Sequence, residues 1–182
     1  GYDSAGLSLF NNGNINTQKT IGKVVDLENL FGESLPSGTV GIAHTRWATH
    51  GVPSSINSHP HTSGPISVVH NGIIENHNEL RKEITEQGIK FSSNTDSEVI
   101  AHLINLNVCT SNSLREAAIK AISRLDGAYA ICVISKDDPG KIIGARSGSP
   151  LVVGLGIGEN FMASDQMALR QVTDRFVYLE EG

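Results

Sequence analysis

Short apolar runs of strand length fall into two groups along this chain, with helix-like segments between them. The runs are residues 7–10, 14–16, 40–43 and 66–69 in the first group, and 128–135, 142–145, 151–154, 160–163 and 176–179 in the second. The segment Asn11-Asn12-Gly13 predicts a tight turn between the first two strands. Because strands cluster with strands and helices with helices, the pattern predicts an α+β fold and not an alternating βαβ sheet.

Helix start and stop signals mark the segments between the two groups of strands. Gly88 follows the first helical segment and suits the left-handed conformation found just after a helix. Residues 95–98 (TDSE) and 113–116 (SLRE) each fit a capping box, which places Asp96 in the first turn of its helix. The expected helices cover residues 78–87, 96–107 and 113 to about 127, with a short one at 165–169.

Composition and charge exclude several classes of protein. The 182 residues are 38% hydrophobic and 18% charged, as in an ordinary globular domain. The formal net charge is -5 and no basic run occurs, so we expect no nucleic-acid partner. The longest apolar runs are far too short to span a membrane, and no membrane partner is expected. Cys109 and Cys132 lack the spacing of a zinc site or a disulfide framework, which favours a reducing, cytoplasmic setting.

The densest polar cluster is residues 44–51 (HTRWATHG), directly after a predicted strand and within the polar stretch 45–64, a predicted long loop. The guanidinium of Arg46 suits a carboxylate, and Thr49 and His50 place further donors beside it. This cluster can therefore hold a small anionic substrate. The alternative is a surface loop in which Arg46 pairs with a nearby acid.

Asn71 and Gly72 follow another predicted strand. A side-chain amide and a glycine N–H together can form an oxyanion hole, because glycine lets a reacting carbonyl approach the main chain. The alternative is a hairpin turn, for which Asn-Gly is the strongest signal, although the segment after Gly72 is short for a second strand. Asp96 likewise has two interpretations: a carboxylate favoured by the helix dipole, or a ligand for a substrate ammonium group.

Two further motifs predict neither a metal nor a cofactor. His59-Pro60-His61 lacks the helical spacing and the acidic partner of a zinc site. The glycines in residues 154–158 (GLGIG) resemble a nucleotide-binding loop, but the apolar run after them is typical of a strand. A dinucleotide site requires a helix there, so we interpret this segment as strand–turn–strand.

Several segments together resemble one family in the same order along nearly the whole chain. They are residues 1–6 (GYDSAG), 44–51, 70–76 (HNGIIEN), 95–98 and 146–151 (RSGSPL). The chain resembles the glutaminase domain of the glutamine–fructose-6-phosphate aminotransferases, which are class II glutamine amidotransferases. The resemblance implies an N-terminal-nucleophile hydrolase-like fold, a four-layer α/β/β/α sandwich, with no cofactor.

The same resemblance implies a role for each candidate residue. Asn71 and Gly72 would form the oxyanion hole, and Asp96 would bind the α-ammonium group of glutamine. Three residues of the first cluster, Arg46, Thr49 and His50, would hold its α-carboxylate. Trp47 resembles a residue that gates the passage of ammonia.

The resemblance also implies a nucleophile that precedes Gly1. In the family an N-terminal Cys attacks the glutamine amide and its own α-amine is the base, and neither Cys109 nor Cys132 matches its position. The family's first strand and helix would precede Gly1 as well, so residues 1–182 alone are expected to be an inactive glutaminase domain.

Further partners also follow from the resemblance. L-glutamine would be the substrate. A sugar isomerase domain beyond residue 182 would use the ammonia to convert fructose 6-phosphate to glucosamine 6-phosphate, within a homo-oligomer. The alternatives are a glutamine-binding module without catalysis, or the glutaminase domain of another class II amidotransferase.

Overall fold

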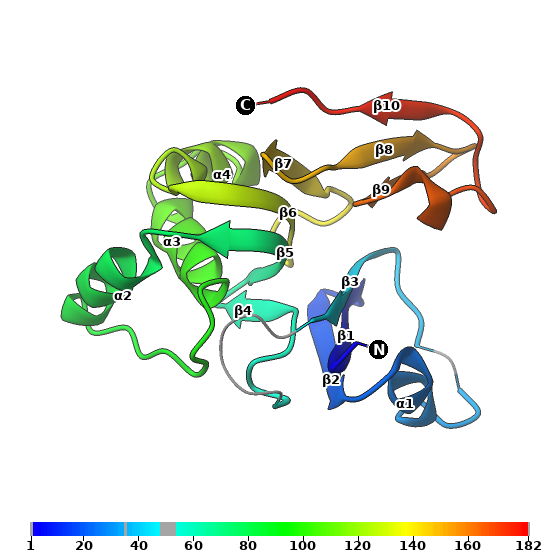
Figure 1. The fold of residues 1–182 in the computed structure, drawn as a ribbon, viewed down its shortest axis with the longest axis horizontal. Helices are drawn as coiled ribbons and strands as arrows, with labels where there is room; N and C mark the ends of the chain where they lie inside the picture. The colour runs from blue at the N-terminus through cyan, green and yellow to red at the C-terminus, as the bar shows by residue number, and fades with distance from the viewer. Residues whose placement is uncertain (1, 35, 48–53, 182) are drawn as a thin grey trace.

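The computed structural model describes residues 2–34, 36–47 and 54–181, and the strands in these ranges form three antiparallel sheets (Figure 1). The strand orders are β2-β1-β3, β4-β5-β6-β7 and β10-β8-β9. The strands are β1 (Ser4–Asn11), β2 (Asn14–Ile21), β3 (Val40–Arg46), β4 (His61–Ser63), β5 (Ile66–Ile74), β6 (Gly127–Ser135), β7 (Ile143–Ser147), β8 (Val152–Leu155), β9 (Asn160–Ala163) and β10 (Phe176–Tyr178). The helices are α1 (Val24–Asn29), α2 (His77–Glu86), α3 (Glu98–Val108), α4 (Leu114–Ile122) and the 3-10 helix η1 (Gln166–Ala168).

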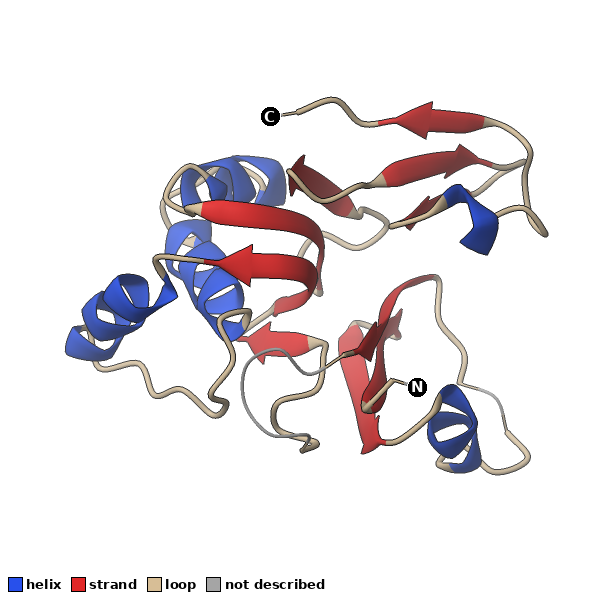
Figure 2. Ribbon diagram, viewed as in Figure 1, coloured by secondary structure: helices blue, strands red, loops and turns tan. Residues whose placement is uncertain are grey.

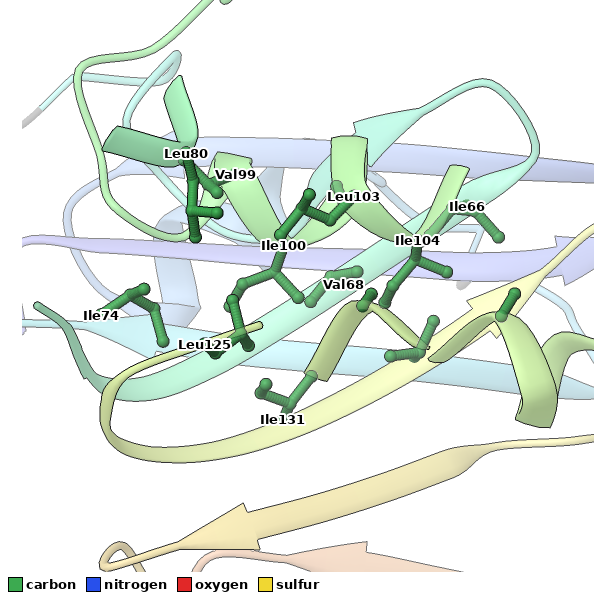
Figure 3. Packing of buried hydrophobic residues seen from close by; sticks show 14 of the residues in the cluster. Ile66, Val68, Ile74, Leu80, Val99, Ile100, Leu103, Ile104, Leu125 and Ile131 are labelled. Carbon is green, nitrogen blue, oxygen red and sulfur yellow. The ribbon is translucent and has the colours of Figure 1, made fainter. Parts of the chain in front are cut away.

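The helices α2, α3 and α4 gather on one side of the central sheet (Figure 2). Strand alternation sends Ile66 and Val68 of β5 toward these helices, where they join the main hydrophobic core. In α3 the first seven residues are all buried, and Ile100 and Ile104 are directed toward the strands (Figure 3). Each fully buried aliphatic side chain of this kind contributes roughly 1.5–3 kcal/mol to folding. This core holds α3 firmly against β5.

The opposite face of the central sheet packs on the first sheet. Val69 of β5 and Ile134 of β6 contact Ile42 of β3 in a second, smaller apolar cluster. Next to it, Ser67 donates a hydrogen bond to Ser8 over 2.8 Å between their Oγ atoms. The Ser8 hydroxyl lies 2.7 Å from the Thr17 hydroxyl. The chain therefore stacks a helix layer, the central sheet and the first sheet, and the contacts between the two sheets include aliphatic side chains and a chain of hydroxyl groups.

Most of the predicted elements are confirmed with shifted ends. Asn12 and Gly13 have positive φ angles of 49° and 81° and form the predicted turn between β1 and β2. Ser113 caps α4 as expected, because its hydroxyl accepts the N–H of Glu116, but α4 ends at Ile122, short of residue 127. The glycine-rich segment 154–158 joins β8 to β9, which confirms strand–turn–strand.

Other expectations are wrong or incomplete. The predicted strand at 66–69 extends to Ile74, and the predicted loop at 45–64 contains β4. The helix predicted at 96–107 is α3, which begins at Glu98 with Ser97 as its N-cap. Asp96 therefore lies before the helix and not in its first turn. The short helix α1 was not predicted at all: its only buried residue is Leu27, which leaves little apolar periodicity to detect.

Candidate functional site

The candidate site lies where β3 of the first sheet meets β5 of the central sheet. His44 of β3 and Asn71 of β5 contact each other, with 2.7 Å between His44 Nε2 and Asn71 Oδ1. Both residues line a cavity of about 320 Å³, whose wall also includes Tyr2, His70 and Ser164. The site is therefore assembled from segments that are distant in sequence and are brought together by the packing of two sheets.

Asn71 and Gly72 lie inside β5 and do not form a turn. They pair with Ala130 and Tyr129 of β6 in an unbroken register. This excludes the hairpin alternative and leaves the Asn71 side chain on the face of β5 that is turned toward β3. Gly72 has φ of 125°, and a β-carbon there would lie 2.0 Å from the carbonyl oxygen of Ala128. Position 72 therefore requires glycine.

The N–H of Gly72 is directed toward an open edge of β5. The pairing of β4 with β5 covers only Ile66 to Val68, so beyond Val68 the described strands flank β5 on the β6 side alone. Ile74 donates its N–H away from β6, to Asp96 Oδ2 at 2.9 Å. Because residues two apart in a strand direct their N–H groups to the same edge, the N–H of Gly72 points to the side where Asp96 lies.

Two opposite charges, Asp96 and Arg46, are buried around this edge. Each side chain is about 5% exposed. Burial lowers the pKa of the Arg46 guanidinium, and the carboxylates of Asp3 and Asp96 act on it in the opposite direction. Arg46 is at the end of β3, where its carbonyl accepts the N–H of Asp3 at 2.8 Å. The pair offers one cationic and one anionic group, which is the complement of a zwitterion.

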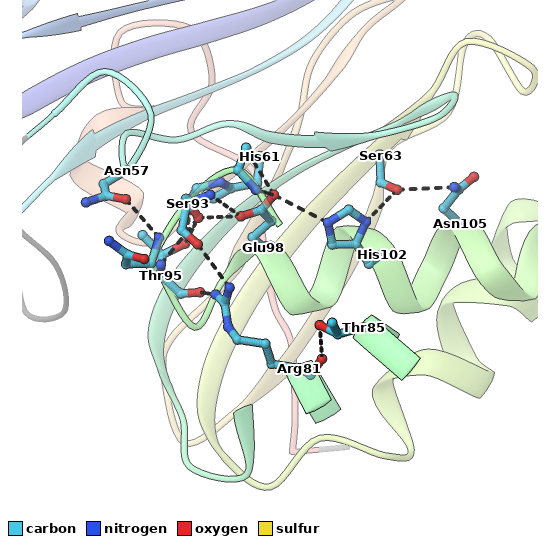
Figure 4. A network of polar contacts seen from close by, with 12 residues as sticks. Asn57, His61, Ser63, Arg81, Thr85, Ser93, Thr95, Glu98, His102 and Asn105 are labelled. Atoms are coloured by element: carbon cyan, nitrogen blue, oxygen red, sulfur yellow. Dashed lines mark hydrogen bonds and ion pairs between the residues drawn. The ribbon is translucent and has the colours of Figure 1, made fainter. Parts of the chain in front are cut away.

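The segment that carries Asp96 is held by Glu98 (Figure 4). One Glu98 oxygen accepts the N–H of Ser92 at 2.8 Å, the other accepts the N–H of Ser93 at 2.6 Å, and both serine hydroxyls donate as well. Burial favours the neutral acid, but hydrogen bonds from His102 and the two serines outweigh it and hold the pKa of Glu98 far below its ordinary value. The capping-box prediction is thus wrong in its geometry, because Glu98 reaches past Thr95 to an earlier pair of N–H groups.

Arg81 of α2 fixes the same segment from the other side. It donates to the carbonyl oxygens of Ser93 and Thr95, at 3.0 and 2.6 Å. The sequence predicted a capping role for Glu98 but not its contacts with Ser92 and Ser93, and it predicted no role for Arg81. The only sequence signal for them is the run of hydroxyl residues before Asp96, which needs partners once the helix packs on the sheet.

Four histidines cluster at the site, and two of them, His44 and His70, line the cavity. The ring of His59 lies 4.2 Å from that of His44, 4.8 Å from that of His61 and 6.4 Å from that of His70, between centroids. Burial lowers the pKa of each, to about 3 for His61 and about 4 for His70, so all four are neutral at neutral pH. Within the described ranges, no group of three or more His, Cys, Asp or Glu side chains is arranged to hold a metal ion.

Comparison with known proteins decides the family. The profile of a family described as "Glutamine amidotransferase domain" matches residues 44–171, a range that includes Arg46, Asn71, Gly72 and Asp96. The chain belongs to the glutamine amidotransferase domain family. This confirms the class II amidotransferase resemblance.

Relatives of this amidotransferase domain carry a common name. The chain is 56% identical to the "Glutamine--fructose-6-phosphate aminotransferase [isomerizing]" of Pseudomonas putida, over 100% of the chain and 30% of that protein. Proteins of the same name from Vibrio vulnificus and Acinetobacter baylyi are 54% and 53% identical over the same shares. The chain therefore spans about a third of the length of the curated relatives it matches.

Solved structures confirm the expected fold of this amidotransferase domain. A glutamine phosphoribosylpyrophosphate amidotransferase from B. subtilis, complexed with ADP and GMP, superposes with a TM-score of 0.82 at 26% identity and covers 100% of this chain and 40% of its own. A structure described as the allosteric regulatory enzyme of purine biosynthesis gives 0.85 at 25% identity, with the same coverage. The α+β, N-terminal-nucleophile hydrolase-like fold class is therefore confirmed.

Of the predicted site residues that are described, Asn71 lines the smaller cavity, and Arg46, Gly72 and Asp96 lie outside its wall. Trp47 follows β3 and is 67% exposed. Thr49 and His50 lie outside the described residues. A larger cleft of about 940 Å³, between β3, β7 and β9, is lined by none of the predicted site residues that are described, and its wall is largely aliphatic. The smaller cavity, lined by Asn71, is therefore the candidate site of this amidotransferase domain.

Neither cysteine is suited to act as the nucleophile. Cys132 lines both cavities, but burial raises the pKa of its thiol to about 11, so the reactive thiolate is scarce at neutral pH. Cys109 is exposed at the end of α3 and lines neither cavity.

Among the helices of the described ranges, none has the length and hydrophobicity of a transmembrane span.

Proposed function

We propose that this domain hydrolyses the side-chain amide of L-glutamine to glutamate and ammonia. The observation that carries the proposal is the arrangement around β5: the Gly72 N–H is turned to the open edge on the side of Asp96, the Asn71 amide lies on the face toward β3, and the buried charges of Asp96 and Arg46 act on each other. When the carbonyl carbon of the amide is attacked at this edge, its oxygen would develop a negative charge beside two donors. Fixed donors of this kind stabilise a tetrahedral oxyanion more than they stabilise the planar amide.

The charged residues fit the other end of the same substrate. Asp96 Oδ2 accepts the N–H of Ile74, and Oδ1 accepts only a 3.5 Å hydrogen bond from the Ser97 hydroxyl, so Oδ1 retains acceptor capacity for an ammonium group. Arg46 would bind the α-carboxylate, together with Thr49 and His50. A substrate held at both charged groups presents its side-chain amide in one orientation, which lowers the entropic part of the barrier.

The nucleophile and the acceptor of ammonia complete the proposal. Because the pKa of Cys132 is raised, the attack is assigned to the cysteine that the family resemblance places outside residues 1–182. The names of the relatives support a further step, in which an isomerase domain uses the ammonia to convert fructose 6-phosphate to glucosamine 6-phosphate. Residues 1–182 would then be the glutaminase domain of a cytoplasmic homo-oligomer, with Trp47 at the exit for ammonia.

The test uses the full-length protein and measures glutamate and ammonia released from L-glutamine. Asn71→Ala is expected to lower kcat by about 10²–10³, the usual loss for one oxyanion donor. Asn16→Ala, a change at an exposed strand asparagine, is the matched control and is expected to leave kcat unchanged. A wild-type protein that binds glutamine in calorimetry but releases no ammonia would instead indicate a binding module.

Arg46→Lys separates binding from chemistry. It keeps the positive charge and removes the planar fork, so the KM for glutamine is expected to rise by about tenfold or more while kcat changes less. An unchanged KM would remove Arg46 from the carboxylate site and leave the hydrolysis itself untouched.

A further inference from the structure

The amide of Asn71 can face the substrate in two ways with opposite consequences. Its Nδ2 carries two donors, which an oxyanion needs, whereas its Oδ1 only accepts and would repel an oxyanion. In the structure Oδ1 is turned toward β3, 2.7 Å from Nε2 of His44. Because an amide oxygen cannot donate, Nε2 must carry the proton of this hydrogen bond.

We propose that His44 is a positioning residue for the reaction, whose Nε2–H fixes the Asn71 amide with its NH2 group toward the reacting carbonyl. The inference rests on the proposed glutaminase function. His44 itself does not touch the substrate in this scheme, and its contribution acts entirely through Asn71.

The neutral state of His44 makes the position of its proton decisive. Burial is the largest influence on the pKa of His44 and lowers it, as does the charge of Arg46, whereas hydrogen bonds with the Asn71 side chain and the His70 main chain act in the opposite direction. A neutral imidazole has one donor and one acceptor nitrogen. With the proton on Nε2 the amide presents its NH2 group to the site. With the proton on Nδ1, Nε2 would accept from Nδ2 and the flipped amide would present its oxygen.

The surroundings of His44 hold its ring in the required place. In the first sheet His44 is paired with Gly6 of β1. A β-carbon at Gly6 would lie 2.0 Å from the carbonyl oxygen of His59, so the absence of a side chain lets the His59 segment approach. The His59 ring then packs on the His44 ring with an interplanar angle of 41°. Neither ring nitrogen of His59 has a hydrogen-bond partner in the described part of the chain, which indicates a packing role.

A double-mutant cycle in the full-length protein tests this role. His44→Phe keeps a ring against His59 and removes the N–H, and it is expected to lower kcat by about 10–100-fold with the KM for glutamine within about threefold. The double variant His44→Phe/Asn71→Ala is expected to be no slower than Asn71→Ala alone, because His44 acts only through Asn71. Additive losses, or an unchanged kcat in His44→Phe, would overturn the inference.

A second variant and a spectroscopic measurement cover the case in which His44→Phe fails to fold. His44→Gln retains a side-chain N–H and is expected to keep kcat within about threefold of the wild type. A loss in His44→Gln as large as that in Asn71→Ala would contradict the inference. Nitrogen-15 NMR of the wild-type imidazole should show the Nε2–H tautomer, and an Nδ1–H tautomer would overturn it without any reference to activity.

The outcomes also separate this inference from the proposed function. If the wild-type protein releases no ammonia from glutamine, the proposed glutaminase function fails, whatever the tautomer of His44. If the wild type hydrolyses glutamine and the cycle is additive, hydrolysis stands and only the positioning role is lost.

Discussion

At Gly72 one missing side chain serves both the packing of the sheet and the chemistry of the site. The β5 main chain adopts φ of 125° there, and its approach to Ala128 leaves no room for a β-carbon. In this conformation the main chain of Gly72 lies close to Ala128 and its N–H is turned to the open edge of β5. A residue with a side chain would have to alter the backbone that presents the donor.

Gly72→Ala is therefore expected to reduce both stability and catalysis. Backbone strain of this kind costs roughly 1–3 kcal/mol, before the contact with Ala128 is counted. Urea denaturation would measure the free energy of unfolding, and ammonia release is expected to fall by at least about 100-fold. Gly13→Ala is the matched control, since Gly13 also has positive φ but has no atom within 4 Å of a β-carbon. Equal effects at the two glycines would refute the argument.

At the scale of elements, the start of α3 and the segment before it behave as one unit. Glu98 is in the first turn of α3, and its carboxylate satisfies the N–H groups of Ser92 and Ser93. A carboxylate that accepts several hydrogen bonds in a buried place is costly to replace, because the donors are left without partners. The position of Asp96 thus depends on a residue two positions later in sequence.

Glu98→Gln tests this dependence. One amide oxygen cannot replace both carboxylate oxygens, so the free energy of unfolding is expected to fall by about 2–3 kcal/mol. The KM for glutamine is expected to rise as the Asp96 segment loosens. Glu116→Gln, the equivalent change near the start of α4, alters a partly exposed side chain that accepts the N–H of Asn112 and pairs with Lys120, and it is expected to have a smaller effect on both quantities. A Glu98→Gln protein as stable as the wild type would show that Glu98 does not hold the segment before α3 in place.

The helix core offers a second measurement at this scale. Ile100 of α3 is fully buried, so Ile100→Ala is expected to cost about 2–5 kcal/mol of unfolding free energy. Ile119 of α4 is 51% exposed, and Ile119→Ala is expected to change stability by less than about 0.5 kcal/mol. Urea denaturation of both variants measures the difference, and similar losses would show that α3 is not packed as described.

Features that depend on neighbouring residues could be predicted from the sequence, and features that depend on long-range contacts could not. The turn at Asn12-Gly13 and the cap at Ser113 are fixed by neighbouring residues, and both were predicted. The position of Asp96 was not, since Glu98 has competing partners that only the tertiary packing brings within reach. The contact between His44 and Asn71 was missed for the same reason, because the two residues belong to different sheets.

At the scale of the whole molecule, the buried histidines tie stability to pH. The pKa of His61 is lowered to about 3 and that of His70 to about 4, from an ordinary 6.5. Below about pH 6.5 these histidines therefore bind protons in the unfolded chain while they remain neutral in the folded chain. Stability is complete above this pH and is lost as the pH falls toward 4. The carboxylate of Glu98 adds to the loss only below its own ordinary pKa of 4.5.

The free energy of unfolding is thus expected to decrease between about pH 6.5 and pH 5. The decrease is about 1.4 kcal/mol per pH unit for each buried histidine that titrates only on unfolding. Urea denaturation at several pH values gives the slope. His59→Phe removes one such group without breaking a hydrogen bond of a ring nitrogen, so its slope should be smaller by about one proton. A flat profile would show that the histidines are accessible to protons in the folded state.

The hydroxyl chain of Ser67, Ser8 and Thr17 has a consequence for alignment. Aliphatic side chains between two sheets resist separation, but they oppose sliding weakly, because their contacts have no preferred direction. A hydrogen bond tolerates little lateral displacement before it weakens. The chain of hydroxyls therefore fixes the lateral position of β1, and with it that of β3, relative to β5. His44 and Asn71 belong to the two different sheets. A lateral shift of one sheet by a fraction of an ångström would therefore first change the hydrogen bond that orients the Asn71 amide toward the substrate.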